Sequence, residues 1–202
     1  MPFVIEESWL PATLTMAPMT DEEFSEFCSE HPDFFFEMSA GGELIIMPPN
    51  YTLAGIRNGK IGFQLEAWTL RDGTGVASDS STGFVLPNGA RRSPDAAWTA
   101  LGRVRQMDPR DMARYWHLCP DFVIELRSPF DRLPVLRDKM REWISNGAQL
   151  AWLIDPERRA VEIFRPAGEP ETRLQQEKIE GEGPVAGFTL HLRPVWDPLA
   201  QD

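Results

Sequence analysis

Two carboxylates stand at positions where a purely structural core would not need them. Asp95 precedes the apolar run Ala96–Trp98, and Glu125 lies inside the apolar run Phe122–Leu126. A carboxylate among apolar side chains costs free energy unless it is paired or binds a metal ion. The alternative is a half-exposed strand whose second face meets water, and for each residue taken singly the sequence favours that alternative.

A third charged residue, Lys139, lies on the apolar face of a predicted helix. At 100° per residue its position falls between those of Val135 and Trp143, inside the apolar arc. Either the side chain reaches out to water along its aliphatic stem, or its ammonium group meets the carboxylates of the preceding strand. The helical spacing alone leaves both readings open.

Together, Asp95, Glu125 and Lys139 are a minimal set for metal-assisted hydrolysis of a phosphodiester. Carboxylates are natural ligands for Mg²⁺, and a divalent cation polarises the phosphoryl group and lowers the pKa of water. A lysine can position or help to deprotonate the attacking water and offset the charge of the transition state. Because each short pattern is common, the spacing by itself is only a moderate signal.

The elements that must position these residues follow from apolar periodicity and turn signals. Thr20 and Glu23 form a capping box, so a helix is predicted to begin there. Further helices are predicted over 52–71 and 134–146. Strands are predicted over 34–38, 43–47, 75–79, 82–86, 93–99, 121–127, 150–154, 161–165 and 188–192.

Strand, helix and strand follow one another over residues 121–154, the order of a βαβ unit, after several hairpins. The turn Pro87-Asn88-Gly89 is predicted to join the strands at 82–86 and 93–99 as one of these hairpins. The sequence therefore predicts an α/β fold with a mixed sheet. At 202 residues the chain fits one domain, predicted over 20–202, after a proline-containing arm at 1–19.

Composition excludes several other kinds of site. Cys28 and Cys119 form no CxxC pair and the three histidines are scattered singly, so neither a zinc site nor a histidine cluster is expected. The first residues carry no basic segment typical of a signal peptide, and no apolar run approaches the ~20 residues of a membrane helix. We expect a soluble, cytoplasmic protein with reduced thiols.

The net charge of −11 weighs against strong binding of nucleic acid through phosphate contacts. The charge is unevenly distributed, since residues 91–141 hold eleven Lys and Arg against seven Asp and Glu, a local balance of +4. A basic middle is compatible with a cleft that faces phosphates. A solvated surface of mixed charge is the more common cause of such a pattern.

Several segments, taken in order, resemble the Uma-two (Uma2) family, whose members are described as "putative restriction endonucleases" of the PD-(D/E)XK nuclease superfamily. The resemblance runs from about Thr20 to Arg165 and continues weakly to Phe188, and the combined order is specific although no single piece is. Its strongest parts are Arg92-Ser93-Pro94-Asp95-Ala96 and Cys119 to Pro129, and similarity also extends over Trp152 to Pro156, Gly42 to Pro49 and Ser80 to Phe84.

The resemblance implies a mixed central sheet flanked by helices, a homodimer and DNA as the substrate. It implies Asp95, Glu125 and Glu43 as ligands of Mg²⁺ or Mn²⁺, with Lys139 as a catalytic lysine that has moved from the strand to the following helix. The strand position two residues after Glu125 is Arg127, which can bind phosphate but cannot act as a base at ordinary pH. A histidine that many relatives carry after the Met-Pro-Pro segment is absent from this sequence.

The first hypothesis is therefore a metal-dependent DNA endonuclease, weak or latent activity included, since a fold does not fix function. The second is a catalytically silent nuclease-like domain that serves as a binding or dimerisation module. The acidic balance and the absent histidine favour the second hypothesis, whereas the set Glu43, Asp95, Glu125 and Lys139 favours the first. A structural protein without a site would require all four residues to be coincidental.

Overall fold

A computed structural model describes residues 11–200, except 18, 48–51, 110 and 113. Its centre is a mixed sheet of six strands in the order β11-β10-β9-β8-β7-β4. These strands are β4 (Gly75–Asp79), β7 (Ala96–Ala100), β8 (Phe122–Leu126), β9 (Leu150–Asp155), β10 (Ala160–Phe164) and β11 (Glu171–Leu174). β8 and β9 are parallel and joined by helix α4 (Leu133–Ser145), which confirms the predicted βαβ unit.

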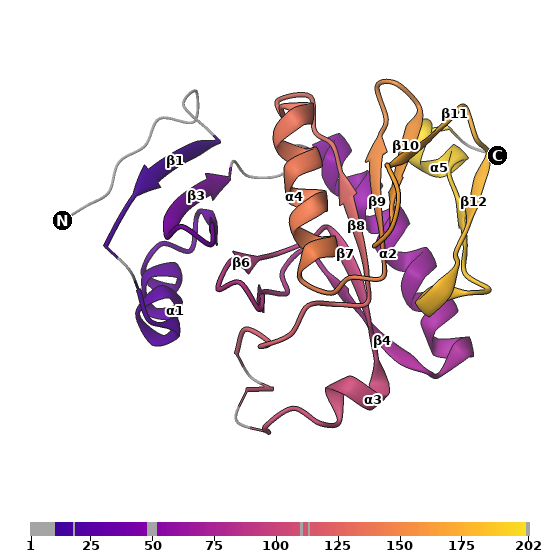
Figure 1. Cartoon of the computed structure of the whole chain (residues 1–202). Helices are drawn as coiled ribbons and strands as arrows, with labels where there is room; N and C mark the ends of the chain where they lie inside the picture. The colour runs from indigo at the N-terminus through magenta and orange to yellow at the C-terminus, as the bar shows by residue number, and fades with distance from the viewer. Residues whose placement is uncertain (1–10, 18, 48–51, 110, 113, 201–202) are drawn as a thin grey trace.

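Helices cover both faces of this sheet (Figure 1). One face packs on α2 (Thr52–Asp72) and on the C-terminal segments, where Phe122, Ile124 and Trp152 enter the core. The other face packs on α4, where Val123 meets Met140 in a second core. Successive residues of β8 therefore point to opposite helices, because side chains alternate along a strand.

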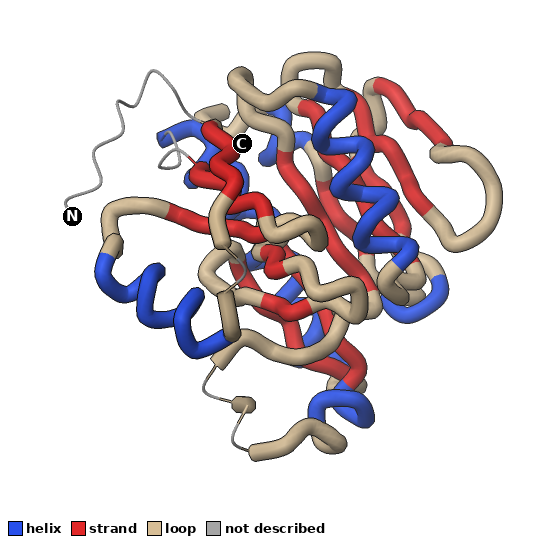
Figure 2. The backbone as a smooth tube through the Cα atoms, turned by 60° about the vertical axis from the view of Figure 1, so that its left-hand side comes forward, coloured by secondary structure: helices blue, strands red, loops and turns tan. Residues whose placement is uncertain are grey.

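A second sheet of five strands lies beside α4, in the order β1-β3-β2-β6-β5 (Figures 1 and 2). Its strands are β1 (Ala12–Thr15), β2 (Phe35–Met38), β3 (Glu43–Met47), β5 (Phe84–Val85) and β6 (Arg91–Arg92). Helix α1 (Asp21–Glu30) packs on it through Phe24. The Thr20–Glu23 capping box is present, and the predicted hairpin of β2 and β3 is confirmed.

The remaining elements are short. They are α3 (Leu101–Val104), β12 (Lys178–Glu180), a 3₁₀ turn (Gly183–Val185), β13 (Thr189–His191) and α5 (Arg193–Trp196). β12 pairs with β13, and Arg57 of α2 donates to the Val195 carbonyl at 2.9 Å, which attaches α5 to α2. In the described part of the chain, no helix is both long and apolar enough to span a membrane.

One predicted hairpin is wrong. The Pro87-Asn88-Gly89 turn joins β5 to the two-residue strand β6, not to the strand that begins at Ala96. After β6 the chain leaves the smaller sheet through Ser93 and Pro94 and enters the large sheet as β7. The crossing places Asp95 at the junction of the two sheets, immediately before β7.

Two segments are more ordered than predicted. β1 lies inside the predicted arm at 1–19 and pairs with β3 across Ala12 to Thr15, whereas residues 1–10 lie outside the described residues. Downstream of residue 167, where the sequence predicts no strand before 188, β11 pairs with β10, and β12 pairs with β13. β11 is polar and largely exposed, and β12 has three residues of which only Ile179 is buried, so neither strand carries an apolar alternation long enough to be recognised.

Candidate active site

Glu125 occupies the face of β8 that packs on α4. The residue is only 4% exposed. β8 is therefore not the half-exposed strand that the sequence left as an alternative for Glu125. One carboxylate oxygen, Oε1, lies 2.8 Å from the ammonium nitrogen of Lys139 and accepts a hydrogen bond from the Trp143 indole N–H at 2.9 Å. Lys139 and Trp143 lie four residues apart on one face of α4, so a single helix supplies both partners.

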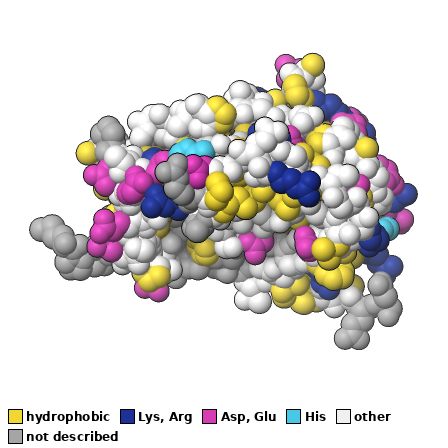
Figure 3. Space-filling view, turned by 90° about the horizontal axis from the view of Figure 1, so that it is seen from below, with side chains coloured by type: hydrophobic (Ala, Val, Ile, Leu, Met, Phe, Trp, Pro, Cys, Tyr) yellow, Lys and Arg dark blue, Asp and Glu magenta, His cyan; other side chains and the backbone are white. Residues whose placement is uncertain are grey.

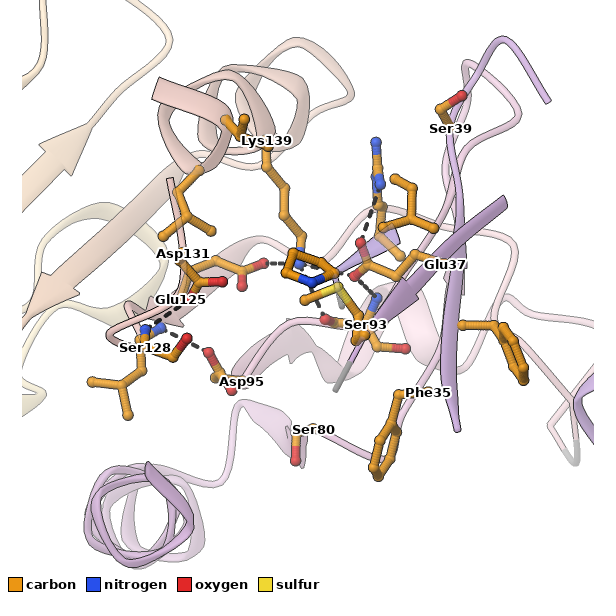
Figure 4. A pocket seen from close by; sticks show the side chains of 18 of the residues that line it. Phe35, Glu37, Ser39, Ser80, Ser93, Asp95, Glu125, Ser128, Asp131 and Lys139 are labelled. Carbon is orange, nitrogen blue, oxygen red and sulfur yellow. Dashed lines mark hydrogen bonds and ion pairs between the residues drawn. The ribbon is translucent and has the colours of Figure 1, made fainter. Parts of the chain in front are cut away.

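The Lys139 ammonium group also lies 2.8 Å from Oε1 of Glu37 on β2. Glu37 accepts further hydrogen bonds from Arg92 at 3.1 Å and from the Ser93 backbone N–H at 3.0 Å. The lysine does not reach out to bulk water, since its side chain is 13% exposed. It joins a carboxylate of the large sheet to one of the smaller sheet (Figure 4).

Asp95 is held from two other elements. Its Oδ1 accepts a hydrogen bond from the side-chain amide of Asn58 on α2 at 2.6 Å, and its Oδ2 accepts one from the Leu126 backbone N–H at 2.7 Å. The amide oxygen of Asn58 is buried and has no hydrogen-bond partner in the structure. A buried acceptor without a donor is uncommon, and a bound water or cation would satisfy it.

Charge and burial shift the pKa values of the cluster in different directions. Burial, and then the charges of Asp95 and Glu37, raise the pKa of Glu125 to about 7 against the opposing pull of Lys139. Burial also raises the pKa of Asp95. Burial acts in the same sense on Glu37, but the charges of Lys139 and Arg92 outweigh it and lower that pKa.

Lys139 is a permanent cation in this arrangement. Burial works to lower its pKa, but the facing carboxylates of Glu125 and Glu37 outweigh burial and raise it above the ordinary value. At neutral pH the ammonium group therefore stays protonated in this arrangement. It can donate hydrogen bonds and offset negative charge.

These residues line a cavity of about 770 Å³ between the two sheets. Glu37, Asp95, Glu125 and Lys139 all lie on its wall, and Figure 4 shows the lysine descending from α4 between Glu125 and Glu37. The structure thus brings four of the predicted residues to one cavity, namely Glu43, Asp95, Glu125 and Lys139.

Glu43 also lines this cavity, but the ion pairs of Lys139 are with Glu37 and Glu125. Glu43 is exposed at the start of β3, where its carboxylate accepts a hydrogen bond from the Ser39 hydroxyl at 3.2 Å. In this hairpin, the acid that contacts Lys139 is Glu37 on the adjacent strand β2. The signal in the sequence was a charged residue within the apolar run Phe35–Met38, the same signal that singled out Glu125.

Arg127 is not among the described residues that line the cavity. Its guanidinium group forms ion pairs with Asp155 at 2.8 Å and with Glu157 at 3.5 Å. Asp155, at the end of β9, is 1% exposed, so its charge requires such a partner. In this arrangement Arg127 neutralises a buried carboxylate and would have to leave it to reach a phosphate.

The donor set suits a hard divalent cation. Among the described residues, no three His, Cys, Asp or Glu side chains already stand as a ligand cluster. The oxygens of Asp95 and Glu125 nonetheless face one cavity, both carboxyl groups have raised pKa values, and the buried Asn58 oxygen lacks a donor. A bound cation would stabilise the ionised form of both carboxyl groups and would give the Asn58 oxygen a partner. Oxygen ligands are those that Mg²⁺ and Mn²⁺ accept.

The fold that holds this site is restriction-endonuclease-like. A solved structure described as a "putative nuclease belonging to DUF820", from Anabaena variabilis ATCC 29413, superposes with a TM-score of 0.74 at 19% identity, covering 91% of this chain and 100% of that chain. This match confirms the predicted fold class.

The family follows from sequence. The model of the Uma2 family, described as "Putative restriction endonuclease", matches residues 21–193, so the chain belongs to this family. The resemblance inferred from the sequence is thereby confirmed. A comparison with curated proteins gives no match.

Proposed function

We propose that this protein is a metal-dependent endonuclease that hydrolyses phosphodiester bonds of DNA. The observation that carries the proposal is the Lys139 ammonium group, held 2.8 Å from both Glu125 and Glu37 in a cavity that Asp95 also lines. A buried lysine between two carboxylates, next to a third with a raised pKa, is an arrangement typical of functional sites.

Each side chain has a distinct task in this proposal. Asp95 and Glu125 would hold Mg²⁺ or Mn²⁺, with Asn58 beside them. The bound cation would polarise the phosphoryl group and lower the pKa of water. Lys139 would donate to a phosphate oxygen and offset the charge that develops there, while Glu37 and Trp143 fix the ammonium group and Glu125 in place.

Glu43 and Arg127 would have secondary tasks. Glu43 lines the cavity and can serve as an additional acid, and Arg127 can bind phosphate only after exchanging its carboxylate partners. Family resemblance also leads us to expect a homodimer, and the two unpaired cysteines lead us to expect a cytoplasmic protein.

The second candidate is a catalytically silent module that binds a partner or dimerises. Two observations favour it. The carboxylates of Glu37 and Glu125 already neutralise the charge of Lys139, and the face of the molecule seen in Figure 3 carries no broad basic surface. There, Lys and Arg side chains form separate small groups among acidic and apolar ones. Such a surface offers few contacts to DNA phosphates.

Calorimetric titration of Mg²⁺ and Mn²⁺ separates the two candidates. Wild-type protein is expected to bind the cation, and the Asp95→Ala/Glu125→Ala double variant to bind it at least about tenfold more weakly, because both ligating carboxylates are lost. The titration is repeated with a DNA oligonucleotide present, since substrate oxygens complete the coordination. If neither protein binds a cation under either condition, the silent module is the better description.

Asn58→Leu is expected to weaken Mg²⁺ binding by about 10–100-fold, as loss of a residue that orients a metal ligand does. Leucine removes both the donor to Asp95 and the unpaired amide oxygen while keeping similar volume. Gln64→Leu, on the same helix but bonded to His191, is the matched control. Unchanged affinity in Asn58→Leu would remove Asn58 from the metal site.

A further inference from the structure

Phe35 presents its ring to the wall of the active-site cavity. The residue is 52% exposed and lines the cavity, whereas its neighbour Phe36 is 5% exposed and enters the core beneath β2. Phe35 and Glu37 share one face of the strand, roughly 7 Å apart along it. Figure 4 shows Phe35 below Glu37 on the strand that forms this wall.

Isolated exposed apolar side chains are normal on protein surfaces, so exposure alone assigns nothing to Phe35. Its position does more, because Glu37 contacts the lysine proposed to meet the phosphate. The ring of Phe35 lies two residues before Glu37 on the same face of β2. A nucleotide whose phosphate meets Lys139 could therefore bring its base to this ring.

The cavity is poor in positive charge for a site that meets DNA. Among the described residues that line it, only Arg92, Arg132 and Lys139 are basic. Seven lining residues are acidic, namely Glu37, Glu43, Asp95, Glu125, Asp131, Asp138 and Glu142. Arg92 and Lys139 are already paired with acids, so this part of the described surface offers few unpaired cations to DNA phosphates.

We propose that Phe35 is a stacking surface for one unpaired nucleobase, and that the substrate is single-stranded or locally unpaired DNA. Base stacking on an aromatic side chain contributes about five- to a hundredfold in affinity and requires no cation. A base within a continuous duplex is already stacked on its neighbours and presents no free face to the ring. This inference rests on the proposed function in so far as the ligand is DNA.

The test measures binding of a labelled oligothymidylate and of a hairpin duplex of equal length, by fluorescence anisotropy with the full chain. Ca²⁺ is supplied as a cation for the carboxylates, and a gel verifies that the DNA stays intact. Wild type is expected to bind the single strand more tightly than the duplex. Phe35→Ala should weaken single-strand binding about tenfold and leave duplex binding unchanged.

Two further variants make the result specific. Phe35→Trp keeps an aromatic face and should bind the single strand within about twofold of wild type. Phe63→Ala removes a phenylalanine that is 74% exposed on α2 and lies outside the cavity lining, so it should bind like wild type. The proposal is overturned if Phe35→Ala matches wild type, if Phe63→Ala loses as much affinity, or if wild type prefers the duplex or binds neither DNA.

The outcome separates this inference from the proposed nuclease activity. Single-strand binding that depends on Phe35, without metal binding or cleavage, supports the stacking surface and contradicts the endonuclease. Cleavage of duplex DNA that is unaffected by Phe35→Ala supports the endonuclease and contradicts the stacking surface.

Discussion

Replacing Lys139 with methionine is expected to lower the rate of DNA cleavage by about 10²–10³-fold while the chain stays folded. Methionine keeps much of the length of the side chain but removes the only charge that contacts both Glu37 and Glu125 in the described structure. Glu37 retains Arg92, and Glu125 retains the Trp143 N–H, so neither carboxylate is left without a partner. Single-turnover cleavage, with circular dichroism as a check of folding, measures the effect.

The matched control is Lys60→Met, which removes an exposed lysine of α2 outside the cavity lining and should cleave like wild type. Lys139→Arg tests whether positive charge suffices, because it keeps the charge but not the compact ammonium geometry. Its rate should lie between those of wild type and Lys139→Met. If Lys139→Met retains activity and Arg127→Met loses it, Arg127 is the working cation and the role assigned to Lys139 is wrong.

The location of Lys139 could be predicted because it depends on one helix and one strand. Helical periodicity places the lysine on the buried face of α4, and the alternation of β8 turns Glu125 toward the same side. These two short-range rules place both side chains between β8 and α4, where the Lys139 ammonium group lies 2.8 Å from Glu125. The βαβ connection, which sets α4 against the strand that precedes it, is also encoded locally by the order of the elements.

The sequence does not reveal the partners that Lys139 and Asp95 receive from distant elements, and the reason is physical. Glu37 meets Lys139 only because the smaller sheet packs beside α4, and Asn58 meets Asp95 only because α2 crosses the opposite face of the large sheet. Neither packing arrangement leaves a periodic signature in the sequence. Glu43, named by resemblance, and Glu37 lie on adjacent strands of one hairpin, so the correct hairpin was predicted although the contacting acid was not.

The misassigned Pro87–Gly89 hairpin has a similar origin. Turn chemistry identifies the turn but not the length of the strands that leave it. β6 contains only Arg91 and Arg92, too short for an alternation of apolar residues, and both arginines are buried through ion pairs. Since Arg92 pairs with Glu37 and Glu142, this short strand also holds the acid that faces Lys139.

Glu162→Ala is expected to lower the free energy of unfolding by on the order of 2–3 kcal/mol at neutral pH. Glu162 lies on β10, is 2% exposed and accepts two hydrogen bonds from the Arg137 guanidinium of α4, at 2.7 and 2.6 Å. Arg158 approaches it at 3.3 Å. Because both arginines are partly exposed, water can solvate them after the change, which keeps the cost below that of stranding a fully buried charge.

The pH dependence of stability distinguishes a charge effect from simple loss of packing. Burial works to raise the pKa of Glu162, but its hydrogen bonds and the charges of Arg137 and Arg158 outweigh burial and hold that pKa below the ordinary value of 4.5. A carboxyl group with a lowered folded-state pKa stabilises the protein above its unfolded-state pKa, and this stabilisation is lost as the pH falls through the folded-state value. The difference between wild type and Glu162→Ala should therefore shrink below about pH 4.5.

Urea denaturation at pH 7 and at successively lower pH values measures this difference. Glu180→Ala is the control, because Glu180 pairs with Lys178 at 2.7 Å on an exposed strand, where solvent screens the pair, and its removal should leave stability unchanged. A difference between wild type and Glu162→Ala that stays constant with pH would mean that side-chain packing, not the ion pair, joins α4 to β10. A difference that shrinks as the pH falls would mean that the ion pairs of Glu162 hold α4 against β10. Glu162 would then help to position the helix from which Lys139 reaches the active site.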